Sequence, residues 1–316
     1  MQRSSALFCA MVAASVLAAC SKKEDAPPPP AAAPAPAPAA EAPPAPKVEV
    51  VHAFKIGELS AMALRDGGME LPNDNKVFGV GGTPEEVAAV LTANRHPADK
   101  LALTIQPLLV KSADRVLLFD TGAGPLFGPG SGQLLASFAD AGIDPQSVTD
   151  IFISHSHGDH VGGLVSAEGK LNFPNATIHL SKPEWEFMSG NDQYKAWVPV
   201  LKDKVDAFKP GAELVPGVVK AVEIKGHTPG HSGYKITSGQ DSLLYVGDSM
   251  HHYIVSVQKP EWTIAFDGDN ATATASRVAL IAELATSGQR AYAVHFPFPG
   301  IGKMQKQGDG IVWVGE

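Results

Sequence analysis

The feature that most restricts the possible folds of this sequence is a run of three histidines and an aspartate. The run is His155-Ser156-His157-Gly158-Asp159-His160, and it directly follows the apolar segment 151–153. Burying these side chains beside a core strand costs free energy unless a partner offsets their desolvation. Alternation along an extended segment places the first two histidines on one side, and a turn can direct the aspartate and the third histidine towards a second centre. Imidazole and carboxylate suit a borderline cation such as Zn²⁺, so the run predicts a metal site rather than an exposed His-rich loop.

The segments around this run predict the fold class. Short β-rich segments alternate with helical ones from residue 48 onward, with no clean break in composition. We expect strands at 48–55, 101–110, 116–119, 150–154, 177–180, 218–224, 233–236, 243–246 and 291–294, and helices at 84–95, 182–188, 194–208 and 271–286. Asp267 and Asp269 precede the last helix, and we expect them to cap it. This order predicts one layered α/β domain over residues 48–316, although periodicity alone fits both a doubly wound sheet and a two-sheet sandwich covered by helices.

The N-terminal segment indicates export. Arg3 precedes a mostly apolar stretch, and Leu17-Ala18-Ala19-Cys20 resembles the bacterial lipobox, in which cleavage before the cysteine accompanies its diacylation. The alternative is an ordinary secretory signal with an incidental cysteine. We therefore expect residues 1–20 to be a lipoprotein signal peptide and the Ala/Pro-rich residues 21–47 to be a disordered tether. The mature protein is then a periplasmic lipoprotein attached through Cys20 alone, and Ser21 favours the outer membrane.

Composition disfavours several kinds of partner and ligand. The chain has 25 Lys and Arg against 33 Asp and Glu, a net charge of −8 that repels the phosphates of a nucleic acid. It contains no run of 18 apolar residues, so we expect no membrane span in the mature protein. The two cysteines, Cys9 and Cys20, both precede the predicted domain, so a metal site there has no thiolate ligand.

The histidine run resembles the signature of the metallo-β-lactamase-fold hydrolases. Four further segments match landmarks of that superfamily in order: Leu118-Phe119-Asp120-Thr121-Gly122, Gly226-His227-Thr228-Pro229-Gly230-His231, Tyr245-Val246-Gly247-Asp248 and Ala293-Val294-His295. The resemblance implies an αββα sandwich that binds two divalent metal ions, with zinc the expected metal. It assigns one ion to His155, His157, His227 and Asp248, and the other to Asp159, His160, His295 and the shared Asp248. It places Asp120 behind the ligands as a support.

A narrower resemblance concerns the substrate pocket. Segments 123–130, 171–176, 214–217 and 295–302 look like the methyl parathion hydrolase branch, which includes lactonases. The resemblance implies that Phe127 and Phe187 line the pocket, with core packing as the alternative for each. His251 lies where lactonases of the superfamily often have a tyrosine, which implies contact with the substrate carbonyl or leaving group; the alternative is a solvent-exposed loop histidine.

The remaining histidines are expected to have structural roles. His231 is expected to support the site or its turn rather than to bind metal. We interpret His52, His96 and His179 as ordinary surface or strand histidines, since none has a companion in the sequence.

These features together predict a dinuclear metal-dependent hydrolase of lactones or related esters, including acyl-homoserine lactones. Two cations can share one water and lower its pKa, so the expected nucleophile is a metal-bridging hydroxide, which Asp159 can orient. The first alternative is a phosphotriester hydrolase of the methyl parathion hydrolase type. Further alternatives are a β-lactamase, a glyoxalase-type thioesterase and a non-catalytic binding lipoprotein. The expected partner is a small ester or lactone, and the oligomeric state stays open, a homodimer being one alternative.

Overall fold

The computed structural model describes residues 48–128 and 130–316. The predicted signal peptide, the lipidation site Cys20 and the predicted tether lie outside the described residues. Within the described part, no helix is both long enough and apolar enough to cross a membrane.

The first sheet contains seven strands in the order β1-β2-β5-β6-β7-β8-β9. Their bounds are β1 Val51–Ile56, β2 Leu59–Leu64, β5 Leu108–Ser112, β6 Arg115–Phe119, β7 Asp150–Phe152, β8 Thr177–Ser181 and β9 Val205–Phe208. Strands β6 to β9 are mutually parallel, whereas the earlier pairs are antiparallel. The carboxyl ends of β6 and β7 therefore lie at the same edge of the sheet.

The second sheet contains seven strands in sequence order, from β10 to β16. Their bounds are β10 Glu213–Val215, β11 Val219–Glu223, β12 Ser232–Ser238, β13 Asp241–Tyr245, β14 Arg290–Tyr292, β15 Ile301–Gln307 and β16 Gly310–Gly315. Strands β13 and β14 pair in parallel, and the other neighbours are antiparallel. The segments that follow β13 and β14 thus leave the sheet at one edge.

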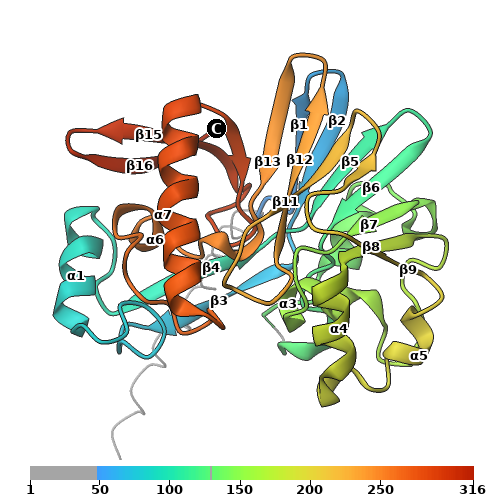
Figure 1. Cartoon of the computed structure of the whole chain (residues 1–316), viewed down its shortest axis with the longest axis horizontal. Helices are drawn as coiled ribbons and strands as arrows, with labels where there is room; N and C mark the ends of the chain where they lie inside the picture. The colour runs from blue at the N-terminus through green and yellow to red at the C-terminus, as the bar shows by residue number, and fades with distance from the viewer. Residues whose placement is uncertain (1–47, 129) are drawn as a thin grey trace, which may run out of the picture. The chain divides into compact units, whose positions relative to one another are not determined.

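The two sheets face each other across an apolar core and carry helices on their outer faces (Figure 1). Phe119 and Phe152 of the first sheet pack in this core with Tyr234 and Tyr245 of the second. The helices are α1 Pro84–Ala93, α2 Leu134–Asp140, α3 Gly158–Val161, α4 Lys182–Gly190, α5 Val198–Leu201, α6 Val255–Gln258 and α7 Asn270–Ser287. Short 3-10 turns span Gly124–Leu126, Pro145–Ser147, Gly162–Leu164, Asp192–Tyr194 and Gly247–Ser249. This layering confirms the predicted αββα sandwich.

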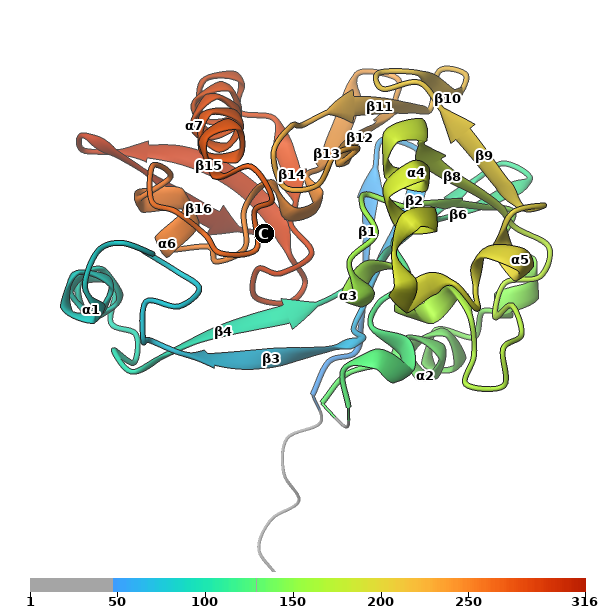
Figure 2. The ribbon, with the colours of Figure 1, turned by 60° about the horizontal axis from the view of Figure 1, so that its bottom comes forward.

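A separate two-stranded hairpin, β3 Gly67–Pro72 with β4 Lys100–Ile105, crosses the lower side of the domain in Figure 2. Helix α1 connects its strands, and Leu101 and Leu103 pack in one cluster with Val87 of α1 and Val255 of α6. The hairpin thus supplies apolar side chains to a region that neither seven-stranded sheet reaches.

Two predicted elements are wrong in the structure. The helix predicted at 194–208 is a 3-10 turn, the short helix α5 and then strand β9, which pairs in parallel with β8. The strand predicted at 101–110 is two strands, β4 and β5, which belong to different sheets. Pro107 interrupts it because a proline has no N–H to donate to a ladder. The other predicted strands and helices match observed elements to within a few residues at each end.

Candidate metal centre

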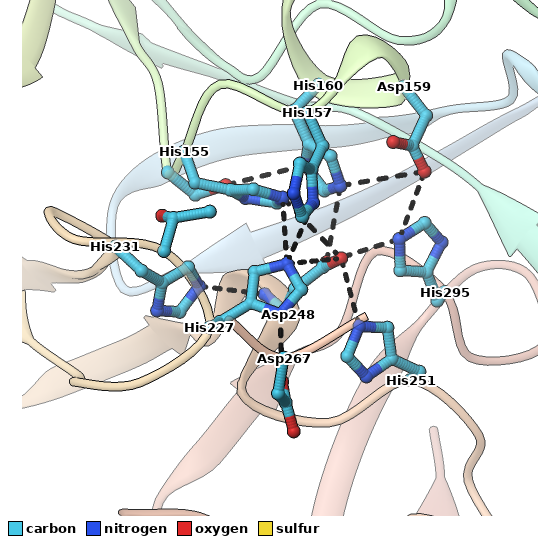
Figure 3. A network of polar contacts seen from close by, with 12 residues as sticks. His155, His157, Asp159, His160, His227, His231, Asp248, His251, Asp267 and His295 are labelled. Carbon is cyan, nitrogen blue, oxygen red and sulfur yellow. Dashed lines mark hydrogen bonds and ion pairs between the residues drawn. The ribbon is translucent and has the colours of Figure 1, made fainter. Parts of the chain in front are cut away.

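The predicted ligand residues come together at one edge of the sandwich, where four strand-to-loop connections meet (Figure 3). His155 and His157 follow β7, and Asp159 and His160 belong to the short helix α3. His227 lies in the loop between β11 and β12, Asp248 follows β13 and His295 follows β14. All of these residues are buried except His157, which is half-buried.

The first ligand group consists of His155, His157, His227 and Asp248, whose nearest donor atoms all lie within 4.8 Å of one another. The Nε2 atom of His227 lies 3.1 Å from Nε2 of His155 and 3.0 Å from Nδ1 of His157. It lies 3.5 Å from Oδ2 of Asp248. Ligands about 2.0–2.1 Å from a tetrahedral Zn²⁺ are about 3.3 Å apart, so these spacings match one coordination shell.

The second ligand group consists of Asp159, His160 and His295. The Nε2 atoms of His160 and His295 lie 3.7 and 3.5 Å from Oδ2 of Asp159. The same two nitrogens lie 3.3 and 3.2 Å from Oδ1 of Asp248. Asp248 therefore directs Oδ2 towards the first group and Oδ1 towards the second, which is the position a shared ligand requires.

Hydrogen bonds on the outer side of the imidazoles fix which nitrogen faces inward. Nδ1 of His160 donates to Asp120 at 2.7 Å, and Nδ1 of His295 donates to the carbonyl of Thr104 at 2.8 Å. Nδ1 of His227 donates to Asp267 at 2.9 Å. An imidazole that donates at Nδ1 keeps a lone pair at Nε2 when it is neutral. Several lone pairs and the carboxylate oxygens of Asp248 thus point at one another.

This arrangement fits bound cations. Nε2 of His160 and Oδ1 of Asp248 are buried without a hydrogen-bond partner. An imidazole nitrogen and a carboxylate oxygen that face one another without a hydrogen bond in a buried site are costly, and a positive charge between them, a metal ion or a proton, removes that cost. Imidazole nitrogen and carboxylate oxygen are the donors that Zn²⁺ and similar divalent ions accept. The donor chemistry therefore supports divalent metal binding.

The two ligand groups differ in the pKa values of their histidines. Burial lowers the pKa of His227 to about 3 and the pKa of His155 well below its usual value, so both imidazoles are neutral at pH 7. Burial also opposes a charge on His160, but the carboxylates of Asp248, Asp159 and Asp120 outweigh it and raise its pKa well above the usual value. Protons therefore compete with a cation more strongly at the second group than at the first.

Asp120 and His231 lie directly behind the candidate ligands. Asp120 accepts hydrogen bonds from Ser154 and from the hydroxyl of Tyr245 as well as from His160. Nε2 of His231 accepts from the backbone N–H of Asp248 at 2.9 Å, so His231 orients the loop that carries the shared aspartate.

The role predicted for Asp267, helix capping, is wrong in the structure. The sequence predicts that Asp267 and Asp269 both cap the last helix, but in the structure Asp269 alone of these two caps α7. Asp267 is buried between Nδ1 of His227 and the guanidinium of Arg277, at 2.9 and 3.0 Å. A single sequence carries no signal for this pairing, because an aspartate two residues before a capping residue is ordinary in a loop.

His251 is buried and faces the centre, not solvent. It is 1% exposed, and its Nε2 lies 3.2 Å from Oδ2 of Asp248. Its ring stacks parallel to that of His295 at 6.0 Å, and neither ring nitrogen has a hydrogen-bond partner within the described part of the chain. The predicted alternative of an exposed loop histidine is therefore wrong. His179 is a histidine of strand β8, which is one of its two predicted alternatives, and it is buried between Asp150 and Asp206.

A cavity of about 530 Å³ opens onto the cluster. Its polar floor includes His157, Asp159, Asp248, His251 and His295, and its apolar walls are Met69, Leu71, Leu103, Phe127, Ala265 and Phe266. Phe127 thus lies where it is predicted, whereas Phe187 is 42% exposed on α4 and is not among the lining residues. The lining also includes Gln193, which the sequence does not single out; it lies in the 3-10 turn Asp192–Tyr194, at the junction between the helices predicted at 182–188 and 194–208.

Comparisons of sequence identify relatives of this chain. Residues 105–287, more than half of the chain, match the profile of the Metallo-beta-lactamase superfamily. The chain is 32% identical over 97 residues to an N-acyl homoserine lactonase from a Bacillus species, which covers 30% of this chain and 35% of the lactonase. It is 39% identical over 80 residues to ribonuclease Z from Chlamydia pneumoniae, which covers 25% of this chain and 26% of the ribonuclease. The matches thus span about a third or less of these curated relatives.

Solved structures match over far more of the chain. AidC, a dizinc quorum-quenching lactonase solved with its product N-hexanoyl-L-homoserine, is 30% identical with a TM-score of 0.79. The alignment covers 84% of this chain and 97% of AidC. The hydrolase AbOPH of the beta-lactamase superfamily is 26% identical with a TM-score of 0.77, over 86% of this chain and 99% of AbOPH.

Proposed function

This chain belongs to the metallo-beta-lactamase superfamily of metal-dependent hydrolases, and we propose that it hydrolyses lactones that carry an apolar chain, including N-acyl homoserine lactones. The observation that carries the proposal is the cavity, which combines a floor of candidate ligands with apolar walls. A lactone ring needs access to the polar floor, and an acyl chain gains from burial against Met69, Leu71 and Phe266.

The comparison with AidC supports this substrate class. AidC binds N-hexanoyl-L-homoserine, and it resembles this chain over nearly its whole length. The similarity to ribonuclease Z is confined to 80 residues, and a chain with a net charge of −8 is poorly suited to bind RNA phosphates. We therefore do not propose an RNA substrate.

We further propose that the centre binds two divalent cations, with zinc as the expected ion. His155, His157, His227 and Asp248 would hold one, and Asp159, His160, His295 and Asp248 the other. When bound, such a pair polarises the scissile carbonyl and lowers the pKa of water so that it becomes a nucleophile at neutral pH.

The side chains around the centre then position the substrate and move protons. Asp159 is the most exposed of the candidate carboxylates, at 8%, and it faces the cavity, where it can accept a hydrogen bond from an attacking water. Cleavage of the ester C–O bond leaves an alkoxide that needs a proton. His251 lines the cavity with unpartnered ring nitrogens, so an imidazolium at this position can donate that proton.

A hydrolysis panel on the metal-loaded domain tests the proposal. It should contain N-acyl homoserine lactones of increasing chain length, a γ-lactone without a chain, an aryl ester, an aryl phosphotriester and a β-lactam. We expect kcat/KM to be highest for the acyl lactones and to rise with chain length by up to about fourfold per buried methylene. Phosphotriester turnover above that of every lactone would favour the alternative function. A kcat/KM that does not depend on the length of the acyl chain would contradict the proposed apolar subsite.

A further inference from the structure

Glu184 is a buried carboxylate that the proposed reaction does not use. It lies in the first turn of α4 and is 0% exposed. Its hydrogen-bond partners in the described part of the chain are all neutral donors. An ionised carboxylate without a cationic partner is costly to bury unless its hydrogen bonds are satisfied, so its contacts indicate what it does.

The two oxygens of Glu184 hold two different loops. Oε1 accepts from the backbone N–H and the hydroxyl of Ser156, at 2.8 and 2.6 Å. Oε2 accepts from the hydroxyl of Thr228 and the backbone N–H of Gly230, at 2.7 and 2.9 Å. Ser156 stands between His155 and His157, and Thr228 follows His227. One side chain thus joins the loops that carry all three histidines of the first ligand group.

The helix itself does not account for these contacts. In α1, Thr83 caps the helix and Glu86, three residues later, accepts from the Thr83 backbone N–H at 2.8 Å, which completes a capping box. In α4, Ser181 is the cap and Glu184 occupies the same position as Glu86. Glu184 instead directs both oxygens to the ligand loops.

Close packing fixes α4 against these loops. A Cβ atom at Gly230 would lie 2.2 Å from Oγ of Ser181 and 2.3 Å from the backbone nitrogen of Glu184, so no larger residue fits there. The Ser181 hydroxyl donates to the carbonyl of Gly230 at 2.6 Å, and the hydroxyl of Tyr194 donates to the carbonyl of Ser156 at 2.7 Å. The start of α4 thus packs directly against the loop of Gly230, and Glu184 reaches both loops from its first turn.

We propose that Glu184 is a positioning residue that sets the spacing between the His155–His157 loop and His227, and thereby the affinity of the first ligand group for its cation. The Nε2 atom of His227 lies 3.0 and 3.1 Å from nitrogens of His157 and His155 on the other loop, so a small separation of the loops changes the coordination distances directly. None of the four donors belongs to the second ligand group. The inference rests on the proposed metal centre, but it does not depend on a lactone being the substrate.

Stepwise metal titration of Glu184→Gln tests this inference without an activity assay. The amide has one accepting oxygen, so its NH₂ group must face the donors of one loop. We expect one equivalent of Co²⁺ to bind about 10- to 100-fold more weakly and the other to bind as in the wild type, because outer partners of metal ligands have effects of this size. Chelator competition gives the two affinities, and the visible spectrum of the cobalt protein reports which coordination shell changes.

Matched variants separate positioning from folding. Glu86→Gln changes the same helix position in α1 and should leave both metal affinities unchanged. Ser156→Ala and Thr228→Val each remove one hydroxyl donor, and each should weaken the same equivalent by a smaller factor. These two variants test the inference if Glu184→Gln does not fold.

Two results would overturn the inference: unchanged affinity for both equivalents in Glu184→Gln, or equal weakening of both. A wild-type protein that binds a single equivalent would contradict the proposed dinuclear centre. In that case, a loss of tenfold or more at the single equivalent in Glu184→Gln would still support the positioning role.

Discussion

Asp267 accepts a hydrogen bond from Nδ1 of His227 at 2.9 Å, while its other oxygen accepts from the buried guanidinium of Arg277 at 3.0 Å. Because each oxygen of Asp267 accepts from a different donor, the orientation of its carboxylate is fixed. His227 therefore carries its proton on the side away from the cluster, and its Nε2 lone pair faces the first ligand group.

Asp267→Asn should weaken metal binding by about 10- to 100-fold. The amide oxygen would pair with Arg277, so the amide NH₂ would face Nδ1 of His227 and favour the tautomer with a proton on Nε2. Metal affinity by chelator competition measures the effect. Asp269→Ala is the control: it removes the cap of α7 and should lower the free energy of unfolding with unchanged metal affinity.

Asp248→Ala should weaken both metal equivalents, since its two oxygens face different ligand groups. The wild-type domain from residue 48 onward should bind two equivalents, and elemental analysis after dialysis gives the content of both proteins. Loss of one equivalent with activity retained would contradict a shared role for Asp248.

His251→Phe should reduce turnover of aliphatic lactones by about 100-fold, the low end for a positioned proton donor. An aliphatic alkoxide is a strong base and needs a proton, whereas a nitrophenolate leaves without help, so activated aryl esters should change much less. The measurements are kcat and kcat/KM for both substrates, with metal content determined in each preparation. An equal decrease for both substrates would show that His251 supports the metal centre instead, which its 3.2 Å contact with Asp248 makes the main competing role.

Asp150 should make stability depend on pH at the amino end of β7. Burial opposes its charge, but hydrogen bonds from His179 and Thr149 and the charge of Arg115 outweigh burial and lower its pKa. A carboxylate whose pKa is lower in the folded than in the unfolded state stabilises the fold above the unfolded pKa. That contribution is lost as the pH falls through the folded pKa.

Asp150→Asn should therefore lower the free energy of unfolding by about 2 kcal/mol at pH 7, and the difference from wild type should shrink below about pH 4. Urea unfolding of both proteins at several pH values measures it. Loss of metal in acid lowers the free energy of unfolding of both proteins, so it cancels in the difference between wild type and variant. A difference that grows as the pH falls would contradict the sign of the shift.

Cys20→Ser should release the protein from membranes or leave an unprocessed precursor, if Cys20 carries the lipid that its lipobox-like segment predicts. Fractionation of cells and mass spectrometry of the mature N-terminus test this. An unmodified protein that begins at another residue in wild-type cells would contradict the anchor.

The residues that come together at the candidate centre could be singled out from the sequence because most of them lie within short local patterns. His155 to His160 follow one apolar strand, and Asp248 and His295 each follow another. Parallel pairing brings the ends of β13 and β14 to one edge of the second sheet whatever the length of the connection, but β7 belongs to the first sheet, so strand prediction alone does not bring its histidines to that edge.

Contacts that depend on packing could not be predicted. The residues of β9 are predicted as helix but pair in parallel with β8, and Gln193 reaches the cavity from a short turn after α4 for which the sequence carries no signal. Glu184 is a stronger example, since the motif Ser181-Lys182-Pro183-Glu184 matches a capping box that the structure does not form. Its real partners are 28 and 44 residues away along the chain.

Both ligand groups draw on both sheets: residues 155–160 follow β7 of the first, and His227, Asp248 and His295 follow strands of the second. The first group forms only when segments as far apart as 155 and 248 have folded against each other, and the second only when segments as far apart as 159 and 295 have done so. Folding of these segments therefore precedes metal binding. The ion that enters is then chosen from those present where folding finishes, because His and Asp sites accept several divalent metals according to supply. If the N-terminal segment exports the chain unfolded, the metal pool outside the cytoplasm decides which ion the centre receives.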